Sequence, residues 1–401
     1  MSEWKTIPAD AFCDSVRDGT HDTPKQVEKG YKLVTAKHIN NGQIDLSDAY
    51  LISEHDYLKI NERSKVEQWD VLMSMIGNGL GKSAVVKDNP EYAIKNLALF
   101  KLGDEIKAKW LHYYLSSKAG QGFIYNSLQG SGQPFISLSL LRKFPIPVPS
   151  DETIMGDIVT ILSRYDSLIE NYQKQIKLLE EAAQRLYKEW FVDLHFPGHE
   201  NTKIVDGVPE GWEKKKVSEI GKVITGKTPS TAKKEYYGEQ IPFITIPDMH
   251  TGIYPTSSQF LSSLGANSQS GKFIPANSLM VSCIGTAGLV CITKEECQTN
   301  QQINSLVLND NSLLYYMYNT FLSLKKHLNN IGSNGATMTN VNKSKFESIE
   351  ILIPTNSISN LYNKAVEQSF RSIKTLSSQI HLLTEARDRL LPKLMNGELA
   401  V

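Results

Sequence analysis

The stretch QIKLLEEAAQRL at residues 175–186 returns as QIHLLTEARDRL at residues 379–390, and this pair decides the fold. Around the first copy, apolar side chains recur at alternating spacings of three and four, and adding 204 gives the matching positions around the second copy. A seven-residue apolar repeat kept over four heptads predicts a left-handed coiled coil. The predicted seam consists of Leu162, Tyr165, Ile169, Tyr172, Ile176, Leu179, Ala183, Leu186 and Trp190 in the first copy, and of Val366, Ile373, Leu376, Ile380, Leu383, Leu390 and Leu394 in the second, where Ser369 and Arg387 fill the other two positions.

Two packing arrangements are open to such helices. Each helix could lie on its own β domain as an ordinary core helix, which predicts a 3.6-residue period and a wider apolar stripe. The narrow seam instead favours packing of the two helices on each other. A pseudo-two-fold axis between the copies would make the helices antiparallel, and four heptads rise about 40 Å. This length is comparable to the ~34–36 Å between DNA half-sites that lie one helical turn apart.

The repeat extends far beyond the helices. Trp4 matches Trp212, and the IGNG turn at residues 76–79 matches IGTAG at residues 284–288. Asn96 in KNLALF matches Asn304 in INSLVL, the motif DTPK matches KTPS, and LHYYL at residues 111–115 matches LLYYM at residues 313–317. GSGQPFISLSLLRKFPIPVP corresponds in the same order to GSNGATMTNVNKSKFESIEILIP. Matches that keep their order show that the chain is two tandem copies of a unit of about 200 residues.

Each copy is expected to combine a β-rich part with a long helix, an α+β fold. The β-rich part alternates short β-prone runs with Gly, Pro, Asn and Ser turns, and includes one short helical stretch near residues 110–117. The predicted boundaries are 1–150 for the first β-rich domain, 151–195 for the first helix, 196–355 for the second domain and 356–401 for the second helix.

The composition limits the classes of protein that the chain can belong to. Lys and Arg together number 43, as do Asp and Glu, so the net charge is zero, which does not suit a non-specific DNA binder with its basic excess. The four cysteines form neither a CxxC pair nor a metal-ligand cluster, so we expect buried thiols in a reducing compartment. With no apolar run of 18 residues and no apolar signal core, the chain is expected to be soluble and cytoplasmic.

The stretch GNGLGKS at residues 77–83 looks like the phosphate-binding loop of an ATPase. That motif requires a glycine at position 76, where Ile76 stands, and it should open a helix. Here Ala84-Val85-Val86 leads into Lys-Asp-Asn-Pro, which is typical of a strand and a turn. The matching CIGTAGLVCI lacks Lys-Ser altogether. We therefore expect two matched glycine turns, each between two strands, with Lys82 as a candidate contact to a DNA phosphate.

Taken together, these motifs resemble the specificity subunits of type I restriction-modification systems, over essentially the full length of the chain. The resemblance implies two target-recognition domains, each followed by a helix, and each reading one half of a bipartite site on double-stranded DNA. It implies that the helices set the spacer and dock two methyltransferase (modification) subunits, with restriction/translocase subunits added. It also implies that this chain has no catalysis or cofactor of its own, while its partners use S-adenosylmethionine to methylate adenine, and ATP and Mg²⁺ to translocate and cleave DNA.

Reading of bases requires polar side chains on rigid turns that enter a groove. The candidates are Thr20, His21, Thr23, Asn78, Lys82, Ser131 and Gln133 in the first copy, and Lys227, Thr228, Ser230, Thr286, Asn334 and Thr337 in the second. For each of them the alternative is local turn chemistry, in which the side chain caps its own backbone. His21 could also be a structural histidine, but it lacks companions at metal-ligand spacing.

The second copy has an unusual composition for a DNA reader, because no arginine lies between residues 201 and 354. Since a bidentate arginine is the commonest contact to guanine, we expect the half-site of the second copy to be read with Lys, Asn, Gln, Ser and Thr.

Three other functions stay open: a coiled-coil adaptor with two protein-binding β heads, an ATPase, and a specificity subunit that serves a fused nuclease-methyltransferase. The acidic helix segment 151–200, with 5 basic and 10 acidic side chains, fits either a partner-binding surface or a solvated face.

Overall fold

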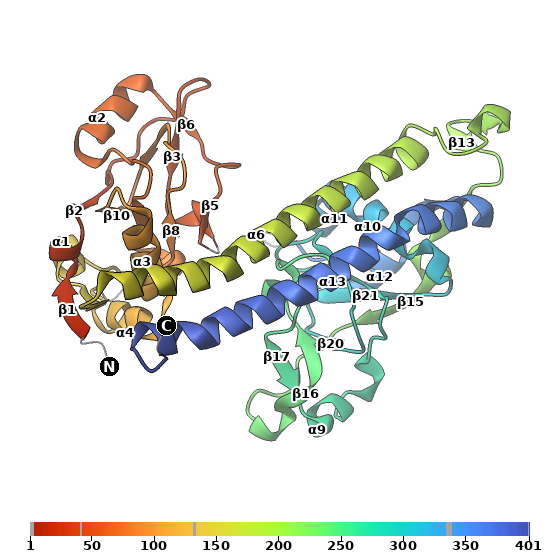
Figure 1. Ribbon diagram of the computed structural model, residues 1–401. Coiled ribbons are helices and arrows are strands. Elements are labelled where there is room, and N and C mark those ends of the chain that lie inside the picture. Colours follow the sequence, from red (N-terminus) through yellow and green to blue (C-terminus); the bar gives the residue numbers. More distant parts are fainter. Residues whose placement is uncertain (1–3, 41, 131–133, 334–338, 400) are drawn as a thin grey trace. The chain divides into compact units, whose positions relative to one another are not determined.

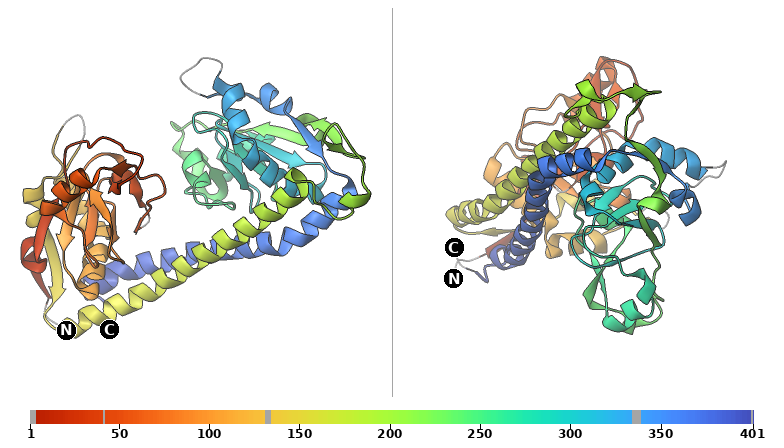
Figure 2. Two further views of the ribbon diagram at one scale, coloured as in Figure 1. Left: turned by 90° about the horizontal axis from the view of Figure 1, so that it is seen from above. Right: turned by 90° about the vertical axis from the view of Figure 1, so that its right-hand side faces the viewer.

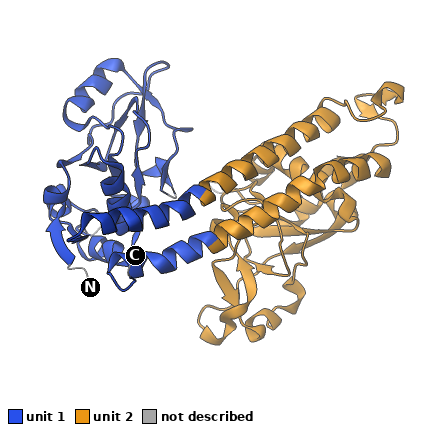
Figure 3. Cartoon of the chain, viewed as in Figure 1, with its two compact units in different colours: residues 1–167, 383–401 blue, residues 168–382 orange. Residues whose placement is uncertain are grey.

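The computed structural model describes residues 4–40, 42–130, 134–333, 339–399 and 401, without the side chains of Asn78 and Ser333. The chain forms two compact units (Figure 3). Unit 1 comprises Met1–Ser167 and Leu383–Val401, and unit 2 comprises Leu168–Leu382. Each unit therefore contains one β-rich domain together with a segment of each long helix.

The two long helices are α6 (Glu152–Tyr187) and α13 (Asn356–Met395). Asp151 accepts a hydrogen bond from the Thr153 backbone at 3.0 Å and so caps the start of α6. A short π-helical turn, η3 (Lys188–Val192), follows α6 directly. Beyond α13 stands Gly397 with φ of 73°, the left-handed conformation in which helices commonly end.

The helices lie side by side and antiparallel within each unit (Figures 1 and 2). In unit 1 the start of α6, with Ile158 and Leu162, shares a core with the end of α13, with Leu391 and Leu394. In unit 2 the order is inverted, because the end of α6 packs with residues near the start of α13, such as Tyr362. The predicted antiparallel pairing of the two helices is thus confirmed.

The sheets of the two units have the same topology, which confirms the tandem repeat. In unit 1 a four-stranded antiparallel sheet has the order β2 (Ser15–Asp18), β10 (Leu97–Lys101), β7 (Val71–Ser74) and β8 (Ser83–Val85). In unit 2 the same order is formed by β15 (Gly221–Thr225), β21 (Ile303–Leu308), β18 (Leu279–Ser282) and β19 (Val290–Ile292).

A three-stranded sheet and a two-stranded sheet are duplicated in the same way. In the order β6 (Leu51–Ile52), β3 (Tyr31–Val34) and β9 (Tyr92–Ile94), the first pair is antiparallel and the second parallel. The counterpart has the order β17 (Gln259–Leu261), β16 (Tyr237–Ile244) and β20 (Gln298–Thr299), again antiparallel and then parallel. The antiparallel pair β1 (Trp4–Pro8) and β11 (Pro145–Pro149) corresponds to β14 (Glu213–Lys216) and β22 (Glu350–Ile353).

Short elements complete each unit. Unit 1 has α1 (Ala9–Phe12), η1 (Ala36–His38), β4 (Ile39–Asn40), β5 (Gln43–Ile44), α2 (Glu54–Ser64), η2 (Gly77–Gly79), α3 (Glu105–Ser116), α4 (Lys118–Asn126) and α5 (Leu138–Arg142). Unit 2 has η4 (His199–Asn201), β12 (Ile204–Val205), β13 (Val208–Pro209), α7 (Val217–Ile220), η5 (Lys234–Tyr236), α8 (Ile246–Met249), α9 (Ser263–Asn267), η6 (Ser270–Lys272), η7 (Asn311–Leu313), α10 (Leu314–Ser323), α11 (Lys325–Ser333) and α12 (Lys343–Glu347). The helical stretch expected near residues 110–117 is α3, which begins earlier because Asp104 caps it through the Lys107 backbone at 2.8 Å.

Each β-rich domain is packed on its helix segments by large apolar side chains. In unit 1 the fully buried Trp110 of α3 stacks on Trp4 with ring centroids 5.9 Å apart, and its indole N–H donates to the Pro147 carbonyl at 2.9 Å. In unit 2 the ring of Phe191, in the turn after α6, lies 4.6 Å from that of Tyr316 in α10 and 5.0 Å from that of Tyr362 in α13. The helices are thus part of each unit's core, in addition to packing on each other.

Candidate nucleic-acid interface

In unit 1 the loop that follows β2 is held against the connection between β9 and β10. The Thr20 backbone donates to Ile94 at 3.0 Å and accepts from Asn96 at 3.1 Å, and Thr20 forms a parallel bridge with Lys95. Gly19 permits this approach, because a Cβ there would lie 2.4 Å from the Ile94 carbonyl oxygen. The backbone of this loop is therefore fixed by strands from another part of the sequence.

In this fixed loop the His21 side chain is exposed to solvent, and contacts at both ring nitrogens fix the orientation of its imidazole. Nδ1 lies 2.8 Å from Oδ1 of Asn96, and Nε2 lies 3.1 Å from Oδ2 of Asp18. The imidazole is 66% exposed, whereas the Asp18 side chain is only 13% exposed. Arg63 at the end of α2 binds the other Asp18 oxygen at 2.5 Å. A largely buried carboxylate thus connects an exposed histidine and an exposed arginine.

The remaining predicted residues of this loop divide into two kinds. The Thr20 hydroxyl accepts a hydrogen bond from the Asp22 backbone at 3.1 Å, which is the local turn chemistry considered as its alternative role. Thr23 is exposed, and its hydroxyl accepts a hydrogen bond from the Lys95 ammonium. The loop therefore gathers His21, Thr23, Arg63 and Lys95, which are donors suited to phosphate oxygens and base edges.

In unit 2 the corresponding loop is held in the same way but carries different side chains. The Lys227 backbone donates to Thr299 at 2.9 Å, and a Cβ at Gly226 would lie 2.1 Å from the Asn300 carbonyl oxygen. Thr228 donates through its hydroxyl to Oε1 of Gln301 at 2.7 Å. Lys227 and Ser230 are exposed, and Thr228 is partly exposed. Here amides and lysine occupy the place that histidine and arginine occupy in unit 1.

A buried amide network supports the loop of unit 2 from beneath. Gln269 donates from Nε2 to the Lys227 carbonyl at 2.8 Å and to Oε1 of Gln298 at 2.7 Å. Lys272 donates to the Thr225 carbonyl at 2.8 Å, and the Thr225 hydroxyl donates to Asn304 at 2.6 Å. These hydrogen bonds hold the exposed residues of the loop in place, although Oε1 of the buried Gln269 has no partner among the described residues.

The glycine turns are confirmed as connections between antiparallel strands. Gly77 and Gly81 have φ of 80° and 81°, and they join β7 to β8. Gly285 and Gly288 have φ of 75° and 89°, and they join β18 to β19. The ATPase interpretation is wrong for this turn, because Ser83 opens a strand and no helix N-terminus is presented.

The side chains predicted on these turns lie as follows. Lys82 is exposed, with Nζ 3.4 Å from Oδ1 of Asn40. Thr286 is exposed, and its carbonyl accepts a hydrogen bond from the Ser282 hydroxyl at 2.6 Å. Ser131, Gln133, Asn334, Thr337 and the side chain of Asn78 lie outside the described residues.

Other residues that contact predicted loop residues were not among the sequence candidates, and they include Lys95 and Asn96 in unit 1 and Gln301 in unit 2. Asn96 and Asn304 recur at the same place of the repeat, and this recurrence was the available signal. Both asparagines accept hydrogen bonds at the base of the loop, from His21 or Thr225.

The residues predicted for the seam of the coiled coil are buried or partly buried throughout both helices. Two leucines outside the seam behave differently. Leu178 is 65% exposed and Leu382 is 61% exposed, and they are separated by the same 204 residues as the repeat. Beside Leu178, a groove of unit 2 is lined by Gln175 and Leu179 of α6 and by Arg371 and Leu376 of α13, among others.

The thiols and the possible metal ligands among the described residues are arranged as follows. The four cysteines are buried and free, and burial raises the pKa of Cys13, Cys291 and Cys297 to about 12 and that of Cys283 to about 11, so the thiols stay protonated. Within the described ranges there is no cluster of three His, Cys, Asp or Glu side chains placed to hold a metal ion. Nor does any helix in the part of the chain that the structure covers have the length and apolarity needed to span a membrane.

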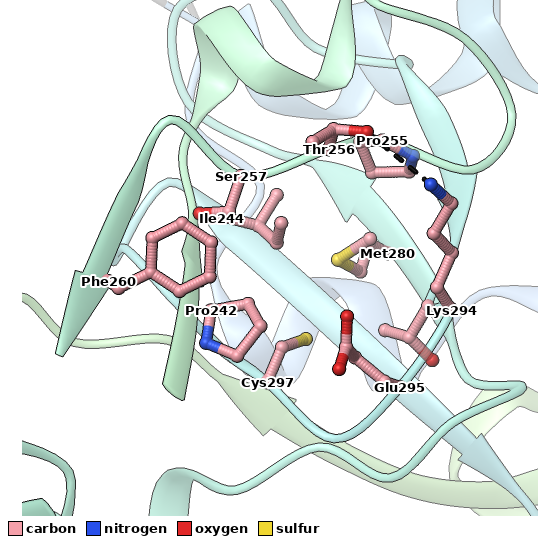
Figure 4. Close-up of a pocket in the computed structure, with 11 residues that line it drawn as sticks. Pro242, Ile244, Pro255, Thr256, Ser257, Phe260, Met280, Lys294, Glu295 and Cys297 are labelled. Atoms are coloured by element: carbon pink, nitrogen blue, oxygen red, sulfur yellow. Dashed lines mark hydrogen bonds between the residues drawn. The ribbon is translucent and has the colours of Figure 1, made fainter. Parts of the chain in front are cut away.

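A small cavity lies in unit 2 (Figure 4). It measures about 70 Å³ and is lined mainly by apolar side chains, with Ile244, Phe260, Met280 and Cys297 among them. Lys294 reaches Thr256 at its edge, with Nζ 3.4 Å from the hydroxyl, and burial lowers the pKa of this lysine. A cavity of this size holds two or three water molecules and is too small for a nucleotide.

Comparisons with known proteins agree with these observations. The sequence profile of a family described as the type I restriction modification DNA specificity domain matches residues 1–181 and 209–382. The HindI specificity subunit of Haemophilus influenzae is 32% identical over 436 residues, covering 90% of this chain and 94% of that protein. The MjaIX specificity subunit of Methanocaldococcus jannaschii is 30% identical over 312 residues, covering 74% and 70%.

A solved structure supports the fold independently of close sequence similarity. The crystal structure of the S subunit of a type I restriction-modification system from M. genitalium superposes with a TM-score of 0.57 at 15% identity. The alignment covers 98% of this chain and 96% of that one. The fold is thus shared with a known structure.

Proposed function

The chain belongs to the type I restriction modification DNA specificity family, and from this premise we propose that it reads a bipartite DNA site, one half with each unit. The chain itself is a specificity subunit with two tandem recognition domains. It would carry no catalysis, and S-adenosylmethionine, ATP and Mg²⁺ would be used by its partner subunits. The polar loops described above would be the surfaces that approach the DNA.

One observation carries the proposal: the same loop, held on the same strands, presents different side chains in the two units. His21, Arg63 and Lys95 gather in unit 1, whereas Lys227, Thr228 and Gln301 gather in unit 2. Arginine and lysine suit guanine, and asparagine and glutamine suit adenine, so two such loops would distinguish different base sequences. A duplicated scaffold with unlike loops is what the reading of two unlike half-sites requires.

The paired helices would dock the modification subunits, with restriction subunits joining the assembly. Leu178 and Leu382 support this role, because exposed apolar side chains at equivalent positions fit two identical partners. The acidic segment 151–200 adds charge to the surface of α6. Since the chain is neutral overall, its partners would supply much of the positive charge needed against the DNA backbone.

Sequencing of methylated adenines in a host that carries the complete system tests this function directly. We expect one motif made of two specific halves around an unspecified spacer. Exchange of residues 1–150 for those of a relative should change the base sequence of one half and leave that of the other half unchanged. A motif that is continuous, or that changes in both halves, would contradict the proposal.

Binding measurements separate this function from that of a protein-binding adaptor. On a random pool of duplexes, the assembled complex should select one motif, whereas an adaptor would select none. The isolated chain should bind the selected duplex weakly and with strong dependence on salt. Equal affinity of the isolated chain and the complex would contradict the proposed contribution of the partners.

A further inference from the structure

The junction between recognition domain and helices is built on equivalent residues in the two units, but with opposite chemistry. In the repeat, Tyr113 of α3 corresponds to Tyr315 of α10, and Asp166 of α6 corresponds to Phe370 of α13. The third member is Arg387 of α13, which corresponds to Ala183 of α6. Each trio therefore contains one residue from the recognition domain and one from each long helix.

In unit 1 the junction is polar, and Asp166 is its centre. The Tyr113 hydroxyl donates to one Asp166 oxygen at 2.5 Å, and Arg387 donates to the other at 2.7 Å. Tyr113 is buried, while the side chains of Asp166 and Arg387 are 28% and 27% exposed. Burial and the Asp166 carboxylate raise the pKa of Tyr113, so its hydroxyl stays a donor. One carboxylate thus binds the recognition domain and the opposite helix together.

In unit 2 the same place is apolar. The Tyr315 and Phe370 rings are stacked, with centroids 4.1 Å apart and planes inclined by 15°. Phe370 is 1% exposed and Ala183 is 3% exposed. The Ala183 carbonyl accepts a hydrogen bond from the Tyr362 hydroxyl at 3.2 Å, and the Tyr315 carbonyl accepts one from the Asn319 amide at 2.9 Å. No ion pair links these three residues, all of which belong to the described part of the chain.

Asp166 lies where it can restrain movement of the first recognition domain relative to α6. Leu162 is the last residue of α6 in the apolar core of unit 1, and Asp166 lies one turn beyond it. Apolar packing is not directional and alone would let the domain rock about the helix. Hydrogen bonds are directional, and those to a charged group are the stronger ones. The trio therefore restrains the domain at the point where its apolar contact with α6 ends.

We propose that Asp166, held by Arg387, is a positioning residue that fixes the orientation of the first recognition domain on the helix pair and thereby restricts the spacer that the protein accepts. The proposal rests on the proposed reading of a bipartite site. A domain free to rock would reach half-sites at neighbouring spacings, whereas a restrained domain reaches one.

Methylation by the assembled complex tests the proposal on duplexes that keep both half-sites and vary the spacer in steps of one base pair. The wild-type complex should prefer one spacer. Tyr113→Phe removes the link from Asp166 to the domain. Arg387→Gln removes the link from Asp166 to α13, together with the pair that Arg387 forms with its neighbour Asp388 at 2.8 Å. Each should lower that preference about tenfold, the size expected for a hydrogen bond to a charged group. Bases within each half-site should remain fully specified.

Matched controls share the chemistry but lie away from the junction. Arg389→Gln removes an exposed arginine of α13 that pairs with Glu385 along the same helix, and Tyr125→Phe alters an exposed tyrosine of α4. Both should leave the spacer preference unchanged. Because Arg387 is partly exposed, its substitution should preserve the fold, and thermal unfolding of each complex checks this.

The outcomes separate the inference from the function on which it rests. If Tyr113→Phe and Arg387→Gln lower methylation equally at every spacer, or leave the preference intact, Asp166 has only a structural role and the inference is wrong. If the wild-type complex itself shows no spacer preference, the proposed bipartite reading is what fails.

Discussion

The Ser83 hydroxyl lies 2.9 Å from Nδ1 of His112, which joins strand β8 to helix α3 in unit 1. In a phosphate-binding loop the hydroxyl of this Gly-Lys-Ser would face a bound Mg²⁺. In this structure Ser83 is buried, and its hydroxyl is hydrogen-bonded to the His112 imidazole. Burial lowers the pKa of His112 to about 4, although the Asp166 carboxylate acts to raise it. The pair therefore contributes to folding as a neutral hydrogen bond.

This lowered pKa predicts that stability depends on pH in a defined window. The unfolded chain takes up a proton at His112 below its ordinary pKa near 6.5, while the folded protein does so only near 4. The unfolded state thus binds more protons in this window, and stability is lost as pH falls through it, by about 1.4 kcal/mol per unit. The contribution of His112 to this slope fades as pH rises above 6.5 and the unfolded chain loses its proton there.

Urea unfolding at pH 5.0 and 6.5 measures this effect, since ordinary carboxylates stay largely ionised over that range. His112→Gln should reduce the loss of stability between the two values, whatever its effect on stability at neutral pH. His327→Gln is the control, because this histidine lies on α11 in the other unit. An unchanged slope in His112→Gln would show that His112 does not cause it.

Lys82 is predicted to contact a DNA phosphate. Lys82→Ala should weaken binding of the complex to all duplexes by a similar factor and reduce the slope of log affinity against log salt by about 0.9. Lys364→Ala, which removes an exposed lysine of α13, should leave the slope unchanged. A loss of affinity restricted to the cognate sequence would assign Lys82 to base reading instead, and measurable ATP binding lost in Lys82→Ala would revive the ATPase interpretation.

The sequence could predict the structural elements that leave a local or a repeated pattern of residues. The 3-4 spacing from Leu162 to Trp190 predicted paired helices, and the two copies of the glycine turn predicted matched strand connections. Contacts such as Tyr113–Asp166–Arg387 could not be predicted, because they join residues far apart in the chain and the repeat itself replaces them with Tyr315, Phe370 and Ala183.

The recognition loops show the same limit. Thr23 and Thr228 stood out as turn residues, but Lys95 and Gln301 are ordinary polar residues in their own segments. They become part of a site only because the fold brings each loop against the segment that contains Lys95 or Gln301. That pairing depends on the tertiary fold, which neither composition nor periodicity records.

Gly19 and Gly226 should each be needed for one half-site. Gly19→Ala would place a Cβ 2.4 Å from the Ile94 carbonyl oxygen, and Gly226→Ala would place one 2.1 Å from that of Asn300. Because backbone cannot yield as a side chain does, each loop must shift. We expect the first variant to lose the base preferences of one half-site and the second those of the other, seen as a shortened motif in methylated DNA.

The chain provides matched controls for these substitutions. Gly122 of α4 and Gly271 of η6 have nothing within 4 Å of an added Cβ, and neither adopts a positive φ. Gly122→Ala and Gly271→Ala should therefore leave the motif complete. If Gly19→Ala and Gly226→Ala also leave it complete, the loops that they support do not read the half-sites.

The second unit should read its bases through Thr228 and Gln301. Thr228→Val removes the hydroxyl that donates to Oε1 of Gln301 at 2.7 Å and frees the amide to rotate, while Gln301→Ala removes the amide itself. A lost amide contact to adenine is worth about 1–3 kcal/mol, or roughly 10- to 100-fold in discrimination at one base pair. Both variants should lower the base discrimination at the same position of one half-site, and Gln301→Ala should do so more strongly.

Selection of bound duplexes from a random pool measures this discrimination, and Ser230→Ala, which alters an exposed neighbour, is a milder comparison. Because residues 201–354 contain no arginine, a complex structure in which an arginine from another segment makes the guanine contacts of this half-site would refute the assignment.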